Sequence, residues 1–209
     1  NFVDLGTAEG KDPLAIYGRY AAALVKRESS FKDCPDILVN TLLDPQTDEL
    51  HTLHPLILRS RWLFGPEFES QEYCSNVTLQ TVARELFKSE EAQFINERNR
   101  PDIVVLPERT TWQMTGIESF DPIDPTLTQL QHVLVIELKK GGFELTRKEV
   151  NQADGYVQDI ASSGAMSGTP FISAWVVGKK VAAGVAREKE VGDGNRKYGR
   201  IRAATFGSL

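Results

Sequence analysis

The most informative part of this chain is the stretch VLVIELKK at residues 133–140. Its first six residues are apolar and rich in β-branched side chains apart from one glutamate, as in strands buried within a sheet. Because side chains alternate across a strand, Glu137 and Lys139 point to the same face as Val133. An acid and a base thus end an otherwise apolar row, where burying a carboxylate is costly unless another group pairs with it.

A helix is predicted to follow this strand. Thr146 and Glu149 have the spacing of a capping box, in which the two residues satisfy each other's backbone N–H groups at the start of a helix. Four apolar residues then recur at helical spacing and predict the face that packs on the sheet. Gln152 and Tyr156 lie one turn apart on a different face of the same helix. The apolar residues are Val150, Ala153, Val157 and Ile160.

The segments on either side extend this strand and helix into a mixed α/β domain around one sheet. Helical periodicity dominates the first third of the chain, and apolar, β-branched runs dominate the last third. The stretch 107–131 is expected to be a long loop, of the kind that often borders a functional site. The predicted elements are helices at 13–25, 35–42, 48–64 and 78–87, and strands at 103–106, 171–177, 181–186 and 201–206.

Composition is that of an ordinary globular protein. The chain has 209 residues, of which 41% are hydrophobic and 25% charged, so it can bury a substantial core. Its apolar runs are too short to cross a bilayer, and it does not open with a signal peptide. The two cysteines, Cys34 and Cys74, can form neither a disulfide scaffold nor a four-ligand zinc site. We therefore expect a cytoplasmic protein with no membrane partner.

The charge is distributed unevenly along the chain. The net charge is −5, but residues 1–133 hold 12 basic and 21 acidic residues, whereas residues 134–209 hold 12 and 8. Such asymmetry favours a polyanionic partner for the basic part. An uneven solvated surface explains it equally well from composition alone.

Three residues at strand ends carry the candidate chemistry. Asp102 follows Arg100 and Pro101 and leads directly into the strand at 103–106, while Glu137 and Lys139 end the strand from Val133. Two carboxylates, a backbone carbonyl and water suit a hard cation such as magnesium. A lysine beside them could orient water or stabilise developing negative charge. The alternative is a simple ion pair at a solvent-facing strand end.

This combination resembles the PD-(D/E)xK nuclease superfamily, whose signature matches Pro101-Asp102 and Glu137-Leu138-Lys139. Further short sequence matches make residues 47–209 most similar to the Shedu type of anti-phage nuclease domain. Residues 1–46 are expected to form a separate helical N-terminal segment. Those matches are Leu50-His51, His54-Pro55, residues 62–67 (WLFGPE), Arg100–Ile103 and Val135–Lys139, followed by Gln152 and Tyr156.

The resemblance implies a restriction-endonuclease-like core in αβββαβ order, with a mixed central sheet flanked by helices. It also implies a Mg²⁺-dependent endonuclease that hydrolyses DNA phosphodiester bonds in anti-phage defence, with Mn²⁺ able to substitute. Asp102, Glu137 and the Leu138 carbonyl would hold the metal. Lys139 would assist the attacking water, and Gln152 would lie near the site. A homo-oligomer is a further expectation.

Many members of the superfamily also use a glutamate on the first helix. In this chain Glu49, which opens the predicted helix, and Glu67, which follows its end, are both candidates; Glu49 is preferred, although their spacing does not decide between them. Lys140, Arg147 and Lys148 flank the site and are expected to contact DNA phosphates. A second basic cluster downstream could bind DNA or simply protect edge strands from aggregation. It comprises Lys179, Lys180, Arg187, Arg196, Lys197, Arg200 and Arg202.

Two other readings remain open from the sequence. The chain could be a catalytically inactive nuclease-fold module that binds DNA or regulates a partner, or a structural α/β domain. The histidines do not have metal-ligand spacing, so core or surface roles are expected for them. They are His51, His54 and His132.

Overall fold

In the computed structural model, the described residues are 48–65, 68–107, 132–166, 170–194 and 196–209. The helices expected at 13–25 and 35–42 lie outside them, as do residues 1–46 as a whole. The expected loop at 107–131, apart from its first residue, and the alternative first-helix residue Glu67 also lie outside.

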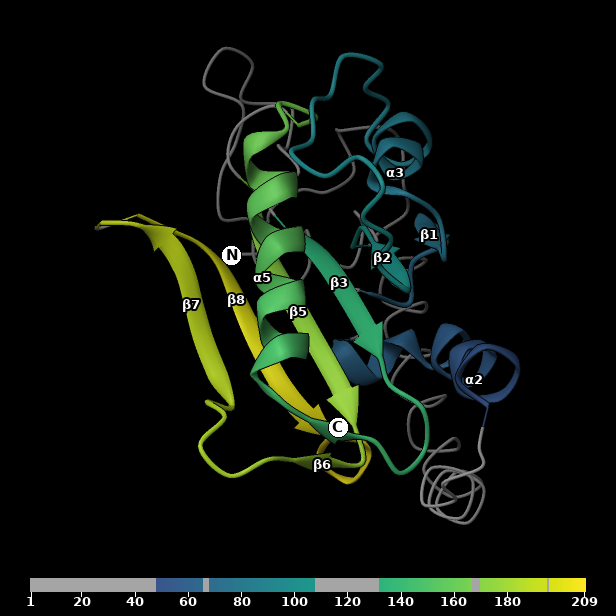
Figure 1. The fold of residues 1–209 in the computed structure, drawn as a ribbon. Coiled ribbons are helices and arrows are strands. Elements are labelled where there is room, and N and C mark those ends of the chain that lie inside the picture. The colour runs from purple at the N-terminus through teal and green to yellow at the C-terminus, as the bar shows by residue number, and fades with distance from the viewer. Residues whose placement is uncertain (1–47, 66–67, 108–131, 167–169, 195) are drawn as a thin grey trace, which may run out of the picture.

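Six strands form one mixed sheet in the order β1-β2-β3-β5-β8-β7 (Figure 1). The strands β1, β2 and β3 are antiparallel neighbours, whereas β3, β5 and β8 run parallel and β7 is antiparallel to β8. The expected mixed α/β class is therefore confirmed. The strands are β1 Tyr73–Ser75, β2 Ile103–Val105, β3 His132–Leu138, β5 Phe171–Gly178, β7 Glu188–Asp193 and β8 Arg196–Thr205.

The crossover between the parallel strands β3 and β5 contains helix α5, Arg147–Ser162. Its capping box is present, with Thr146 and Glu149 satisfying each other's backbone groups as the sequence predicts. Figure 1 shows α5 lying along one face of the sheet. The predicted apolar face of α5 is buried against this sheet, with Val157 and Ile160 at most 2% exposed. The helix is thus anchored by local capping and by core packing.

A series of short helices supplies the core on the other side of the sheet. Ile57 and Phe64 belong to the same buried cluster as Leu134, Ile136 and Leu138 of β3. These helices are η1 (Glu49–Leu53), α2 (His54–Arg59) and η2 (Arg61–Phe64).

The prediction of one continuous helix over 48–64 was wrong. Pro55 in the first turn of α2 has no N–H, so it cannot extend the backbone ladder from the preceding turn. Ser60 then leaves helical geometry at φ −121° and ψ 32°. Beyond it, the buried Arg61 guanidinium donates to the carbonyl oxygens of Leu58 and Ser70. These hydrogen bonds satisfy the buried guanidinium at the point where α2 ends.

The smaller elements differ most from expectation. Helix α3 (Leu79–Glu85) confirms the predicted helix at 78–87, with Thr78 as its N-cap. The strand expected at 181–186 is only β6, Lys180–Val181, which pairs with β4, Glu144–Leu145. A turn follows in which Gly184 adopts a φ of +79°, so the strand cannot continue. Short 3₁₀-helix η4 (Phe206–Ser208) closes the chain.

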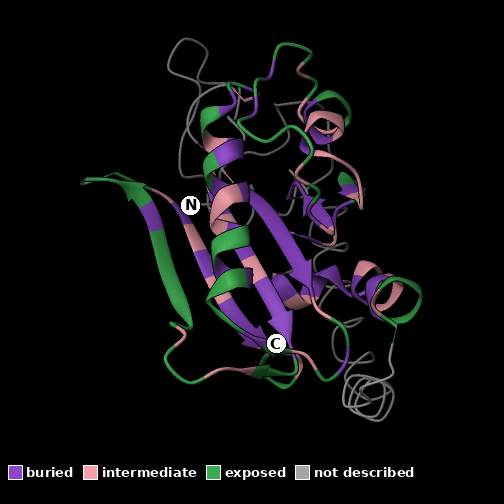
Figure 2. Ribbon diagram, viewed as in Figure 1, coloured by how far each residue is buried: buried purple, intermediate pink, exposed green. Residues whose placement is uncertain are grey.

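The edge strand β7 was missed because its sequence, EKEVGD, lacks apolar alternation. Only Val191 is buried, and the other residues of the strand are exposed. Strand β8 also begins five residues before the predicted start at 201. By contrast, the central strand β3 is buried along almost its whole length, as Figure 2 shows. Among the described helices, none is both long and apolar enough to span a membrane.

Candidate active site

The carboxyl end of β3 brings together residues that are far apart in sequence. In the antiparallel pair of β2 and β3, Ile103 lies opposite Ile136. Continuing this register by one residue places Asp102 beside Glu137. The backbone N–H of Leu138 donates to Asp102 Oδ2 at 2.6 Å and fixes this arrangement. The two carboxylates expected to share a site therefore lie on adjacent strand ends.

Glu137 is the centre of a buried hydrogen-bonded group. Its side chain is 5% exposed, and its Oε1 accepts from Lys139 Nζ at 2.6 Å and from Gln152 Nε2 at 2.9 Å. The prediction that Glu137 and Lys139 share a face is thus confirmed. Glu137 Oε2 is also buried, but it has no hydrogen-bond partner among the described residues. One carboxylate oxygen is held from two sides while the other is left without a donor.

Tyr156 connects helix α5 to the segment that leads into Asp102. Gln152 Nε2 donates to the Tyr156 hydroxyl at 2.6 Å, and that hydroxyl donates to the Arg100 carbonyl oxygen at 3.3 Å. Tyr156 is only 2% exposed. The sequence predicted that Gln152 and Tyr156 share a helix face, but it did not predict the hydrogen bond from Tyr156 to the Arg100 backbone. These contacts fix α5 relative to both carboxylates.

Burial keeps the two carboxyl groups from ionising easily. Desolvation, with a contribution from the charge of Glu49, raises the pKa of Asp102 to about 6, although the Leu138 N–H opposes the shift. Desolvation and the nearby charge of Asp102 raise the pKa of Glu137 to about 7. Burial lowers the pKa of Lys139, but its bond to Glu137 and the surrounding acids outweigh this and raise it. A cation would favour the ionised form of both carboxyl groups.

The donor set fits a magnesium-like ion. It offers two carboxylates, one with an unpaired buried oxygen, and Mg²⁺ commonly binds one or two protein carboxylates together with water and substrate phosphates. No group of three or more His, Cys, Asp or Glu side chains with metal-binding geometry occurs in the described part of the chain. Glu49 is half-buried and acts on Asp102 through its charge. The role of Glu49 as a catalytic residue and that of the Leu138 carbonyl as a metal ligand stay predictions.

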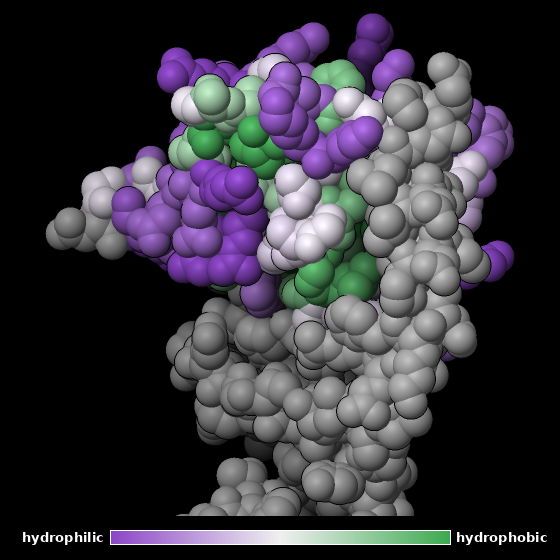
Figure 3. Space-filling model, turned by 90° about the horizontal axis from the view of Figure 1, so that it is seen from below, coloured by the Kyte–Doolittle hydropathy of each residue, from purple (hydrophilic) through white to green (hydrophobic). Residues whose placement is uncertain are grey.

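The basic residues fall into two groups. Lys140, Arg147 and Lys148 are exposed, and no ion pair joins any of them to another described residue. In the downstream cluster, several cations are paired across the edge strands: Lys197 lies 3.6 Å from Glu190, and Arg202 lies 3.0 Å from Glu188. This pairing favours edge protection for that cluster. Figure 3 shows hydrophilic side chains gathered on the side of the molecule where β7 lies.

His54 is a site neighbour whose role the sequence did not indicate. It is 6% exposed, and its Nε2 lies 3.1 Å from the Asp102 carbonyl oxygen and 3.3 Å from Ser75 Oγ. The expectation of a core or surface role therefore did not include this contact with the backbone of Asp102. His51, on the preceding turn, is exposed and pairs with Asp48. Nothing in their spacing distinguishes the two histidines, because the contact with Asp102 depends on a strand 48 residues away.

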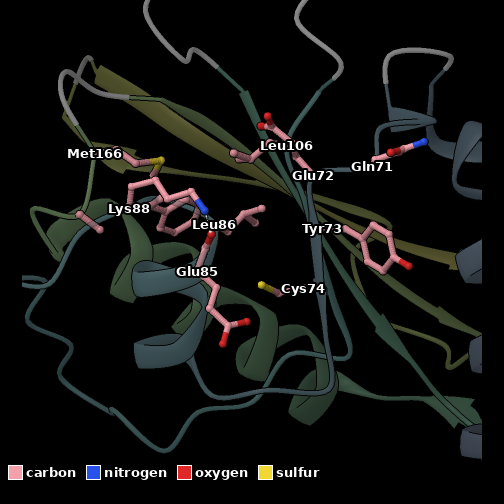
Figure 4. Close-up of a pocket in the computed structure, with 11 residues that line it drawn as sticks. Gln71, Glu72, Tyr73, Cys74, Glu85, Leu86, Lys88, Leu106 and Met166 are labelled. Carbon is pink, nitrogen blue, oxygen red and sulfur yellow. Dashed lines mark hydrogen bonds between the residues drawn. The ribbon is translucent and has the colours of Figure 1, made fainter.

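A separate cavity of about 500 Å³ lies beside β1 and the end of α3. Figure 4 shows Cys74 and Leu86 directed into it, whereas Tyr73 points away on the other side of β1. Burial raises the pKa of the Cys74 thiol, which keeps the thiol in its unreactive protonated form. None of the residues that bond at the carboxyl end of β3 lines this cavity. It is therefore distinct from the candidate active site.

No protein-family model, curated protein or solved structure matches this chain.

Proposed function

We propose that this chain is a divalent-metal-dependent DNA endonuclease of the PD-(D/E)xK type, most similar to the Shedu nucleases of anti-phage defence. The observation that carries the proposal is the convergence of Asp102, Glu137 and Lys139 at one buried point, where no described residue donates a hydrogen bond to Glu137 Oε2. The order α2-β1-β2-β3-α5-β5 also agrees with the αβββαβ core expected of the superfamily, with η2 inserted between α2 and β1, α3 between β1 and β2, and the short strand β4 between β3 and α5.

A purely structural ion pair accounts less well for these contacts. An exposed lysine–carboxylate pair contributes only about 0–1 kcal/mol. Here the side chains of Lys139 and Glu137 are 18% and 5% exposed, so both groups are largely desolvated. A buried acceptor without a donor costs roughly 1–3 kcal/mol. A fold that accepts this cost next to a second buried carboxyl group is better explained by a ligand than by stability.

In the proposed mechanism, Asp102, Glu137 and the Leu138 carbonyl hold Mg²⁺, which Mn²⁺ can replace. When bound, the ion would supply positive charge to the scissile phosphodiester and the attacking water. Gln152 keeps the Glu137 carboxylate oriented through the bond to Oε1. The Lys139 ammonium, anchored on the same oxygen, would orient water and stabilise negative charge on the phosphate.

DNA would approach across the surface beside the start of α5. Lys140 follows β3, and Arg147 and Lys148 lie in the first turn of the helix, so all three are near the carboxylates along the chain. Their exposed charges can contact backbone phosphates without reading sequence. This mode of contact supports non-specific DNA affinity. The homo-oligomer and the cytoplasmic location remain expectations that accompany the proposal.

The test is plasmid cleavage with Mg²⁺, with Mn²⁺ and with a chelator. Wild type should cut only with metal, and Asp102→Asn and Lys139→Ala should each lower the rate by about 10²-fold or more, since removing one electrostatic stabiliser commonly has this effect. Lys189→Ala is the matched control. It breaks a lysine–carboxylate bond of 2.9 Å to Asp154 of α5, which like Glu137 has a buried oxygen without a partner among the described residues but makes no hydrogen bond to Asp102, Glu137 or Lys139, and it should cleave like wild type.

Cleavage at the wild-type rate by both site variants would contradict the proposal. If wild type binds DNA but cleaves it with neither metal, the inactive DNA-binding or regulatory module becomes the better description. If it binds neither metal nor DNA, the structural α/β domain does.

A further inference from the structure

We infer that His54 is a positioning residue that holds Asp102 in place for metal binding. The inference rests on the proposed function, because it assigns His54 a role through Asp102 and gives it no contact with substrate. It starts from the position of His54, a buried histidine at the first residue of α2.

The backbone of Asp102 is held by two donors. Its carbonyl oxygen accepts from the N–H of Asn76 at 2.7 Å and lies 3.1 Å from His54 Nε2. Because a carbonyl oxygen only accepts, Nε2 must carry a proton in this contact. The imidazole therefore acts as a directional N–H donor to the residue that precedes β2.

The side chain of Asp102 is held separately. Leu138 N–H donates to Oδ2 at 2.6 Å, and no other described hydrogen bond engages the carboxylate. With the main chain fixed by His54 and one oxygen fixed by Leu138, the second oxygen has a defined direction. Groups that orient a metal ligand without touching the metal commonly contribute about 10–100-fold in metal affinity, and His54 would do so through the main chain of Asp102, not through its carboxylate.

The same contact also joins three elements. His54 belongs to α2, Ser75 Oγ on β1 lies 3.3 Å from its Nε2, and Asp102 leads into β2. Glu49 lies five residues before His54 on the adjoining helical turn. A histidine that only filled the core would not need to meet the backbone of a site residue.

The experiment is a calorimetric titration of the full chain with Mn²⁺ in the absence of DNA. His54→Leu should weaken Mn²⁺ binding by about 10–100-fold. His54→Gln should stay close to wild type, because its amide N–H can reach the position of Nε2, whereas the shorter His54→Asn cannot and should resemble His54→Leu. His51→Leu is the matched control on the preceding turn and should bind like wild type, since His51 is exposed.

A second readout separates positioning from simple destabilisation. In cleavage assays His54→Leu should require more Mn²⁺ for half-maximal rate but recover most of kcat at saturating metal. If His54→Leu does not fold, the comparison of His54→Gln with His54→Asn still tests the inference. Equal Mn²⁺ affinity for wild type and all folded His54 variants would overturn this inference alone. Absence of Mn²⁺ binding by wild type would overturn it together with the proposed metal site.

Discussion

Each end of strand β3 buries an ionisable side chain, but the surroundings of the two side chains differ. His132 at the start and Glu137 near the finish are both ionisable groups in a buried strand. Desolvation lowers the pKa of His132 to about 4 and, together with Asp102, raises the pKa of Glu137 to about 7. In both cases burial disfavours the charged form. The two ends differ in the hydrogen-bond partners and charges around the uncharged side chain.

At the first end the imidazole is accommodated by the core. Its Nε2 lies 2.8 Å from Ser173 Oγ, and its ring makes edge contacts with Phe68 and Phe171 at centroid distances of 5.4 and 5.8 Å. At the other end Glu137 Oε2 has no donor among the residues that the structure describes, and a second carboxyl group lies beside it. The comparison teaches that burial alone does not mark a site. The carboxylate end is distinguished by a buried oxygen without a donor among the described residues beside a second carboxyl group, and the proposed metal site rests on this difference.

The largest effect we predict on stability is a pH dependence of opposite sign at the two ends. Neutral His132 in the folded chain binds fewer protons than in the unfolded chain between pH 6.5 and about 4. Stability should therefore fall as the pH is lowered through that window, by at most about 3 kcal/mol. His132→Gln should flatten this loss in urea unfolding curves. An unchanged pH slope would show that His132 is not the group responsible.

At the carboxylate end the sign is reversed. Asp102 and Glu137 have raised pKa values in the folded chain, so it binds more protons than the unfolded chain from their ordinary values up to about 6 and 7. Metal-free stability should fall as the pH rises through this window. The same urea curves above pH 7 should show Asp102→Asn more stable than wild type, since one of two neighbouring buried charges is gone.

A somewhat smaller effect is expected from Mg²⁺ itself. An ion that binds only the folded chain at 100 times its Kd adds about 2.7 kcal/mol of stability. Thermal melting at pH 8 should therefore shift upward with Mg²⁺ in wild type and in His132→Gln, but not in Asp102→Asn. A shift that survives in Asp102→Asn would place the ion elsewhere and would remove the distinction between the two ends of β3.

The smallest predicted effect concerns the exposed cations beside the site. Lys148→Ala should weaken DNA binding similarly for all sequences and reduce the slope of log affinity against log salt by about 1. Lys197→Ala, which removes a cation already paired with Glu190 on the edge strands, should change the slope much less. Filter binding over a series of salt concentrations measures both. Equal slopes for the two variants would remove the distinction between the basic groups.

Local patterns were sufficient for the elements that hold the site. The alternation of a strand and the spacing of a helix are properties of neighbouring residues, so the sequence predicted β3, the capping box of α5 and the shared face of Glu137 and Lys139. The same patterns placed Gln152 and Tyr156 together on the helix. They failed for β7, whose charged edge carries no apolar alternation, and for the break at Ser60.

The contacts that make these residues a site depended on the folded chain. The bond from Leu138 to Asp102, the contact of His54 with the Asp102 carbonyl and the isolation of Glu137 Oε2 arise from strand register and desolvation. Strand register pairs segments that lie tens of residues apart, and desolvation depends on everything that packs around a side chain. Neither produces a periodic pattern in the sequence. Residue type and spacing therefore named the candidate acids and base, while packing determined which of their atoms are held and which one is left open.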